Sequence, residues 1–72
     1  MDLLKNIGIE IVRLRNKKNV SQEKLAFSAN IDRRYMSDIE NGRRNISVEI
    51  LFKIAKALGT TGSEILKVAE KE

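Results

Sequence analysis

The segment at residues 31–45, IDRRYMSDIENGRRN, gathers side chains that could recognise another molecule. It holds four arginines in two adjacent pairs, at positions 33–34 and 43–44, together with three acidic residues. A guanidinium presents a planar fork of N–H donors that matches the oxygens of a carboxylate or phosphate, or the edge of a guanine. Ile31, Met36 and Ile39 recur in the same segment as if one side were buried. The arginines would then occupy the opposite side of a helix.

The side chains on which most catalytic and metal sites depend are missing. The 72 residues include no cysteine and no histidine, which removes thiolate ligands, the commonest metal ligand and the usual general base. We therefore expect no enzyme activity, no metal and no cofactor. The longest apolar run is too short to cross a bilayer, and no apolar stretch with a cleavage site follows Met1, so we expect no signal peptide. We expect a cytoplasmic protein with no membrane association.

The positive charge is confined to the middle of the chain. The net charge is +4, yet residues 13–44 alone carry nine basic and four acidic side chains. Residues 1–12 have a net charge of −1, and residues 45–72 are neutral. Clustering of this kind is the electrostatic footprint of a nucleic-acid binder, although small domains are also often basic by chance.

Apolar residues recur at helical spacing along the chain, which predicts one all-α domain over residues 1–72. The expected helices of this compact five-helix bundle are at about 3–18, 22–29, 33–41, 48–58 and 62–69. The expected N-terminal caps are Ser21, Asp32, Ser47 and Thr61, the last in a capping box with Glu64. The residues expected to end helices or relieve turns are Asn19, Asn30, Gly42 and Gly59, because Asn and Gly tolerate the left-handed conformation.

The second and third of these helices have the form of a helix-turn-helix. Ala26 is small enough to let the two helices cross closely, and Asn30 relieves the turn. Met36 and Ile39 place the second helix of the pair against the core. Any two helices joined by a tight turn need similar features, so the spacing alone leaves a purely structural hairpin open.

Four motifs carry a resemblance: SQEKLA, Asn30-Ile31, YMSDIENG and LFKIAKALG. They resemble the lambdoid phage repressor and Cro class (XRE-like) of helix-turn-helix DNA-binding domains, over about residues 7–66. Within that class, DRRYMSDIENGRRN most resembles the controller proteins of restriction–modification systems, which are short dimeric transcription regulators. Asn19 and Asn30 stand where the class usually has Gly, a mild departure. The resemblance implies a lambda repressor-like fold and a prokaryotic or phage, nucleoid-associated protein.

By this resemblance the helix at 33–41 is the recognition helix, which lies in the major groove of double-stranded DNA. The side chains expected to contact bases are Arg33, Arg34, Tyr35, Ser37 and Asp38. We favour an orienting role for Asp38, which lies one turn from Arg34, over a contact with a cytosine amino group. Three alternatives stay open: Arg33 could pair with Asp32 or reach phosphate only, and Tyr35 could pack against the preceding helix.

Phosphate contacts are expected on both sides of the recognition helix. Ser21 and Gln22 open the helix at 22–29, where the family contacts phosphate, with plain capping as the alternative. The residues expected to contact the next phosphates are Asn41, Arg43, Arg44 and Asn45. The family pattern also implies a structural salt bridge between Arg15 and Glu40, joining the first helix to the third.

One recognition helix reads few bases, and the family uses a two-fold homodimer that places two such helices about 34 Å apart. The helix at 48–58 has more apolar residues than its buried stripe requires, and Phe52 is the candidate for an exposed one. Phe52 could also simply complete the core. The expected interface residues are Phe52, Gly62, Ser63, Glu64 and Ile65. We thus predict a homodimeric transcription regulator, either repressor or activator, acting on a pseudo-palindromic operator. A restriction–modification operon is its candidate target, and RNA polymerase is a further candidate partner.

The alternative function is a protein-interaction or antitoxin-like module of the same fold, with secondary DNA binding. Such a module predicts a larger exposed apolar patch and a main activity that depends weakly on salt.

Overall fold

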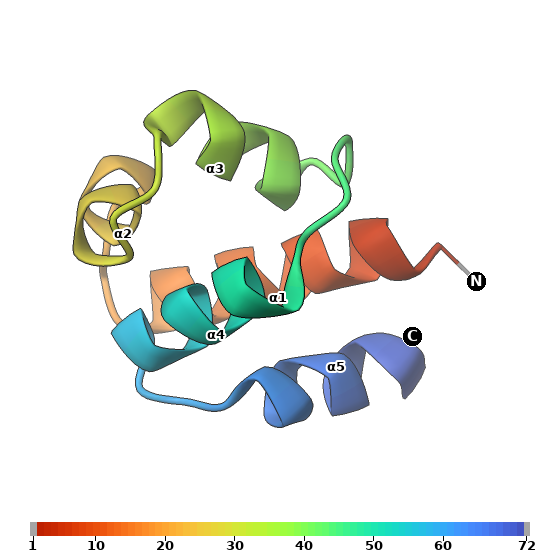
Figure 1. The fold of residues 1–72 in the computed structure, drawn as a ribbon. Coiled ribbons are helices and arrows are strands. Elements are labelled where there is room, and N and C mark those ends of the chain that lie inside the picture. The colour runs from red at the N-terminus through yellow and green to blue at the C-terminus, as the bar shows by residue number, and fades with distance from the viewer. Residues whose placement is uncertain (1, 72) are drawn as a thin grey trace.

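The first residue of each helix coincides with the start expected from the sequence. The computed structural model describes residues 2–71. In this part of the chain it contains α1 (Leu3–Lys17), α2 (Gln22–Ser28), α3 (Arg33–Glu40), α4 (Val48–Ala57) and α5 (Gly62–Lys71). α1 packs against α3 and α5, and α4 packs against α2 and α5. Figure 1 shows α3 along the top of the molecule, α5 along the bottom, and α1 and α4 between them. No helix in residues 2–71 is both long and apolar enough to cross a membrane.

Side-chain caps set these helix starts. Oxygens of Asp2, Ser21, Asp32, Ser47 and Thr61 each accept a hydrogen bond of 3.0–3.3 Å from a backbone N–H two or three residues further on. The first N–H groups of a helix have no partner within it, so each cap stabilises its helix by about 1 kcal/mol. The sequence reading missed one of them, Asp2.

The turns that follow the first four helices each hold one residue with a left-handed backbone. These are Asn19 (φ 56°), Asn30 (φ 57°), Gly42 (φ 69°) and Gly59 (φ 73°), the four residues expected from the sequence. Asn and Gly adopt this conformation at little cost, whereas β-branched residues would be strained there. The short turns between helices therefore follow directly from the sequence.

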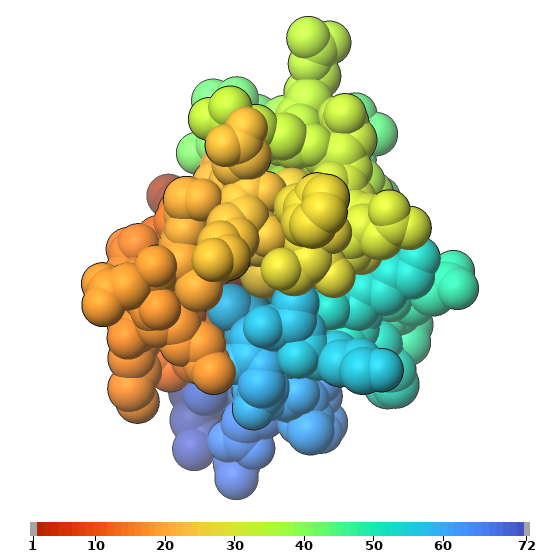
Figure 2. Space-filling model, turned by 90° about the vertical axis from the view of Figure 1, so that its left-hand side faces the viewer, coloured from red at the N-terminus to blue at the C-terminus, as the bar shows by residue number. Residues whose placement is uncertain are grey.

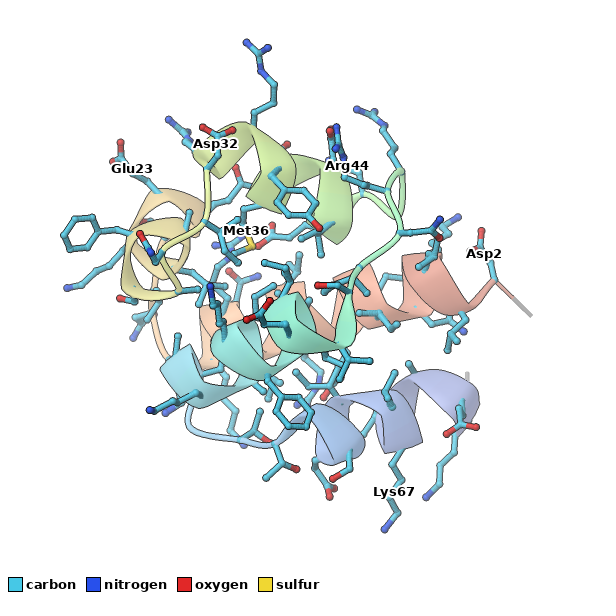
Figure 3. The ribbon with its side chains drawn as sticks, viewed as in Figure 1. Asp2, Glu23, Asp32, Met36, Arg44 and Lys67 are labelled. Atoms are coloured by element: carbon cyan, nitrogen blue, oxygen red, sulfur yellow. The ribbon has the colours of Figure 1, made fainter. Side chains whose placement is uncertain are left out.

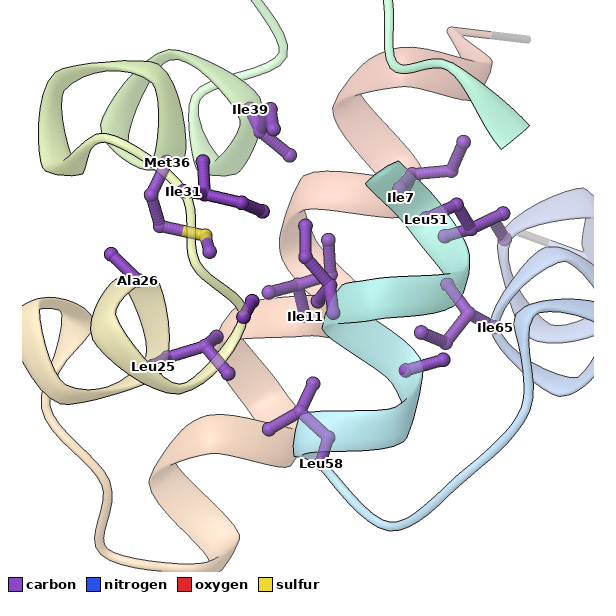
Figure 4. Close-up of a cluster of buried hydrophobic side chains, with 14 residues drawn as sticks. Ile7, Ile11, Leu25, Ala26, Ile31, Met36, Ile39, Leu51, Leu58 and Ile65 are labelled. Carbon is purple, nitrogen blue, oxygen red and sulfur yellow. The ribbon is translucent and has the colours of Figure 1, made fainter. Parts of the chain in front are cut away.

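The core collects apolar side chains from all five helices and from the turn before α3 (Figure 4). Ile11 of α1, Met36 of α3 and Ile54 of α4 are fully buried within it. α1 and α3 approach so closely that a Cβ added to Gly8 would meet the carbonyl oxygens of Ile39 and Glu40. The recognition helix expected from the sequence is thus fixed from below, at its C-terminal end, by the backbone of α1.

Candidate nucleic-acid interface

The outer face of α3 carries the side chains expected to contact bases. Arg33 and Arg34 are exposed at the start of the helix, while Ser37 and Asp38, one turn later, are half-buried. Side-chain atoms of the α3 region project beyond the rest of the surface in Figure 2. In Figure 3, Met36 points from the same helix into the interior. The two faces of α3 are therefore separated as the apolar spacing predicts.

Asp38 pairs with Arg44 and not with Arg34. Its Oδ2 lies 3.5 Å from Nη2 of Arg44, so the expectation that Asp38 orients Arg34 is wrong. The left-handed turn at Gly42 sends the chain back across α3 and brings Arg44 within reach instead.

Tyr35 is held between the core and the same arginine. The side chain is partly buried against the core cluster, and the guanidinium carbon of Arg44 lies 5.1 Å from the centre of its ring. This is the geometry of a cation–π contact. Figure 3 labels Arg44 at the C-terminal end of α3. Arg44 is therefore oriented by two residues of α3.

Arg15 and Glu40 form a two-pronged ion pair that links α1 to α3. Nε of Arg15 lies 2.9 Å from Oε2 of Glu40, and Nη2 lies 3.1 Å from Oε1. The exposed fractions of the two side chains are 15% and 5%. Nη1 of Arg15 also donates to the carbonyl oxygen of Val20, at 3.0 Å. A bidentate pair with a further hydrogen bond fixes the geometry of both groups.

Gln22 turns its amide toward this ion pair. Its Nε2 donates to Oε1 of Glu40 at 3.0 Å, and the side chain is half-buried. Ser21 beside it acts as the cap of α2, with its Oγ accepting from the backbone N–H of Lys24. The cap and a phosphate contact are compatible, because a hydroxyl can accept one hydrogen bond and donate another.

The remaining candidates for phosphate contact lie just beyond the end of α3. Asn41, Arg43 and Asn45 are all exposed. Nδ2 of Asn41 donates to the carbonyl oxygen of Ser37 at 2.9 Å, which helps to satisfy the last turn of the helix. Together with Arg44 they place two positive charges next to the outer face of α3.

A third ion pair lies within α1 and was not predicted from the sequence. The buried Glu10 accepts from Nε and Nη2 of Arg13 at 2.8 and 2.7 Å. The Glu10 carboxylate raises the pKa of Arg13 above its usual value, through the hydrogen bond and the attraction of opposite charges. Arg13 is engaged within its own helix while 56% of its side chain stays exposed. The i, i+3 spacing was the available signal.

The face formed by α4 and the start of α5 has a different character. Phe52 is 61% exposed and Val48, one turn before it, is 70% exposed. The Phe52 ring covers Gly62, where an added Cβ would lie 2.9 Å from two ring carbons. An open hollow beside the ring is lined by residues of both helices and of the turn between them, among them Lys53, Thr61 and Ser63.

The structure buries two of the expected interface residues, Gly62 and Ile65, and exposes an apolar candidate that was not expected. Ile65 is 1% exposed, so its expected place in a dimer interface is wrong: it faces inward from α5 and has no surface to offer. Ser63 and Glu64 remain exposed beside Phe52. Val48 was missed, although its i, i+4 spacing to Phe52 was visible. Phe27 on α2, exposed by 86%, was missed as well.

Within residues 2–71, no group of three or more acidic, His or Cys side chains could hold a metal ion. The polar groups brought together around α3 are arginines, amides and hydroxyls, and the carboxylates of Asp38 and Glu40 are each paired with an arginine. Such groups donate hydrogen bonds to phosphate oxygens and base edges.

Comparison with known proteins places this arrangement in a family. A family model described as Helix-turn-helix matches residues 11–65. The control protein C.MunI of a Mycoplasma species is 43% identical over 72 residues, covering 99% of this chain and 97% of that protein. The control protein C.BamHI of Bacillus amyloliquefaciens is 51% identical over 51 residues, which cover 71% of this chain but only 63% of that relative.

The solved structures agree with the sequence relatives. The crystal structure of the restriction–modification controller protein C.AhdI from Aeromonas hydrophila superposes with a TM-score of 0.83 at 39% identity. The match covers 86% of this chain and 94% of that one. The chain therefore belongs to the repressor- and Cro-type helix-turn-helix family, whose members are DNA-binding transcription regulators and not enzymes.

Proposed function

We propose that this protein is a homodimeric controller of a restriction–modification operon that binds a pseudo-palindromic operator. One observation carries the proposal. Two exposed arginines open a recognition helix that is fixed to the core, in a chain 43% identical over nearly its full length to a control protein. Its target is double-stranded prokaryotic DNA, which it binds in the cytoplasm.

Side chains on the outer face of α3 contact the bases. Arg33 and Arg34 lie at its N-terminal end, which is the end that contacts base edges when such a helix lies in the major groove. An arginine fork on guanine O6 and N7 discriminates against other bases by about 1–3 kcal/mol. Tyr35, Ser37 and Asp38 complete the reading set. The pairing of Asp38 with Arg44 reduces the repulsion that an acid would meet near DNA.

Phosphate contacts position the protein on the duplex. The proposed set flanks α3 on two sides and consists of Ser21, Gln22, Asn41, Arg43, Arg44 and Asn45. Each cationic contact releases counterions from DNA, so affinity should fall steeply as salt rises.

Dimerisation is proposed through the apolar face of α4 and α5. Phe52 and Val48 supply its exposed apolar surface, with Ser63 and Glu64 at its edge. Gly62, buried under the Phe52 ring, and Ile65 are not part of it. A two-fold axis at this face would present two recognition helices to successive major grooves. The bound dimer would then repress or activate by blocking or contacting RNA polymerase.

The test is binding of the purified protein to a duplex from upstream of its own coding region, followed by fluorescence anisotropy. A scrambled duplex of equal length and composition serves as the control. We expect at least a hundredfold preference for the upstream duplex, and a mass of two chains in solution at micromolar concentration. Equal affinity for both duplexes with weak salt dependence would support the protein-interaction alternative instead.

A further inference from the structure

Three helices meet at one buried carboxylate. Glu40, at the end of α3, accepts from Arg15 of α1 through both of its oxygens, at 2.9 and 3.1 Å. Its Oε1 also accepts from Nε2 of Gln22, the first residue of α2, at 3.0 Å. The Glu40 side chain is only 5% exposed. Arg15 and Gln22 are therefore placed relative to each other by a residue of the recognition helix.

The chemistry of the carboxylate decides which way the amide of Gln22 faces. An ionised carboxylate accepts hydrogen bonds and cannot donate them, so only the nitrogen end of the amide can face Glu40. A primary amide nitrogen carries two N–H groups, and Glu40 accepts one of them. The other has no acceptor among the residues that the structure describes. It is a fixed donor available to an acceptor outside the chain.

The ion pair also makes this donor suitable for an anion. The bidentate contact with Arg15 balances the negative charge of Glu40, so an approaching phosphate oxygen does not face an uncompensated acid. Replacing Glu40 by a neutral amide would leave the nearby Arg15 charge without its partner. It would also let the amide of Gln22 turn over, because an amide can both donate and accept.

We infer that Glu40 is a positioning residue for DNA binding, holding Gln22 so that its second N–H meets a DNA phosphate. This inference rests on the proposed function. Its consequence is that the phosphate contact of α2 and the base contacts of α3 are set by one group. A phosphate bound by Gln22 thus fixes where the recognition helix lies in the groove.

The test is a double-mutant cycle on operator affinity. Gln22→Ala should lower the affinity roughly tenfold, the size expected for a hydrogen bond to a charged group. In a Glu40→Gln background the same change should lower it less than about threefold, because the amide is no longer oriented. Arg43→Ala is the matched control, since Arg43 lies outside this network, and it should cost the same factor in both backgrounds. An equal loss for Gln22→Ala in both backgrounds would overturn the inference.

Two measurements keep the test decisive if Glu40→Gln does not fold. Glu40→Asp retains the charge but shortens the reach to Gln22, and circular dichroism shows whether either variant is helical. In the wild-type protein, the side-chain NH₂ resonances of Gln22 should shift when operator is added, and unshifted resonances would refute the contact. Wild-type protein without duplex preference would instead refute the proposed function, whatever the cycle gives.

Discussion

The two faces of this molecule that could bind a partner differ in polarity and in how their side chains are held. The face of α3 is polar, and its groups are oriented by contacts within the chain: Asp38 and Tyr35 orient Arg44, and Glu40 orients Gln22. The face of α4 and α5 is apolar, and Phe52 and Val48 protrude from it. The polar face is complete in one chain, whereas the apolar face gains free energy only when something covers it. We therefore expect substitutions where α1 packs against α3 to affect folding, and substitutions at Phe52 to affect assembly.

The largest effect is expected from Gly8→Ala. The added Cβ would meet the backbone carbonyl oxygens of Ile39 and Glu40, and backbone cannot move aside as a flexible side chain can. We expect a loss of about 3 kcal/mol or more in the free energy of unfolding, measured by urea denaturation. Loss of operator binding should accompany it. A variant as stable as the wild type would mean that α1 and α3 are not locked together.

Phe52→Lys should separate assembly from folding. The ring is 61% exposed in the single chain, so helicity by circular dichroism should be preserved. A buried aromatic anchor contributes about 2 kcal/mol or more to an interface, so dimer affinity should fall at least thirtyfold. Light scattering across a concentration series measures this. Ile9→Lys, on an exposed position of α1, is the matched control and should leave the dimer intact.

Arg34→Ala and Arg43→Ala should distinguish base contacts from phosphate contacts on the polar face. Loss of a base contact by Arg34 should reduce the preference for operator over scrambled duplex by about 1–3 kcal/mol. Loss of a phosphate contact by Arg43 should weaken both duplexes alike and reduce the salt slope by about one. Anisotropy titrations at several salt concentrations distinguish the two. If both variants weakened both duplexes equally, α3 would not be the reading helix.

A small effect is expected from Gly62→Ala, the counterpart of Gly8→Ala on the apolar face. Its Cβ would lie 2.9 Å from ring carbons of Phe52, but this ring is largely exposed and can rotate away. The unfolding free energy should change by less than about 1 kcal/mol, again by urea denaturation. A loss comparable to that of Gly8→Ala would show that the Phe52 ring is fixed within the chain, contrary to its proposed role in assembly.

Local signals explain why so much of the fold could be predicted. The caps at Ser21 and Asp32 and the left-handed turns at Asn19 and Asn30 depend on a few neighbouring residues. Such signals are visible in a sequence. The ion pair of Arg15 with Glu40 spans 25 residues and came from family resemblance, because no local pattern joins them.

The errors concern side chains whose environment is set by distant parts of the chain. The partner of Asp38 depends on the path of the loop after Gly42, which returns Arg44 to α3. The place of Ile65 depends on which neighbouring helix covers α5, and periodicity gives a stripe but not its cover. The orientation of the Gln22 amide likewise could not be predicted from the sequence, because it depends on where Glu40 lies.

The separation of the two sides of α3 also bears on how target preference can change. Met36 and Ile39 hold the helix in the core, whereas Arg33 and Arg34 are exposed and make no core contact. Replacing Arg33 and Arg34 by other residues should therefore leave the unfolding free energy nearly constant, within about 0.5 kcal/mol. The same framework can in this way be retargeted to a new operator by substitutions at its outer positions, without repacking the interior.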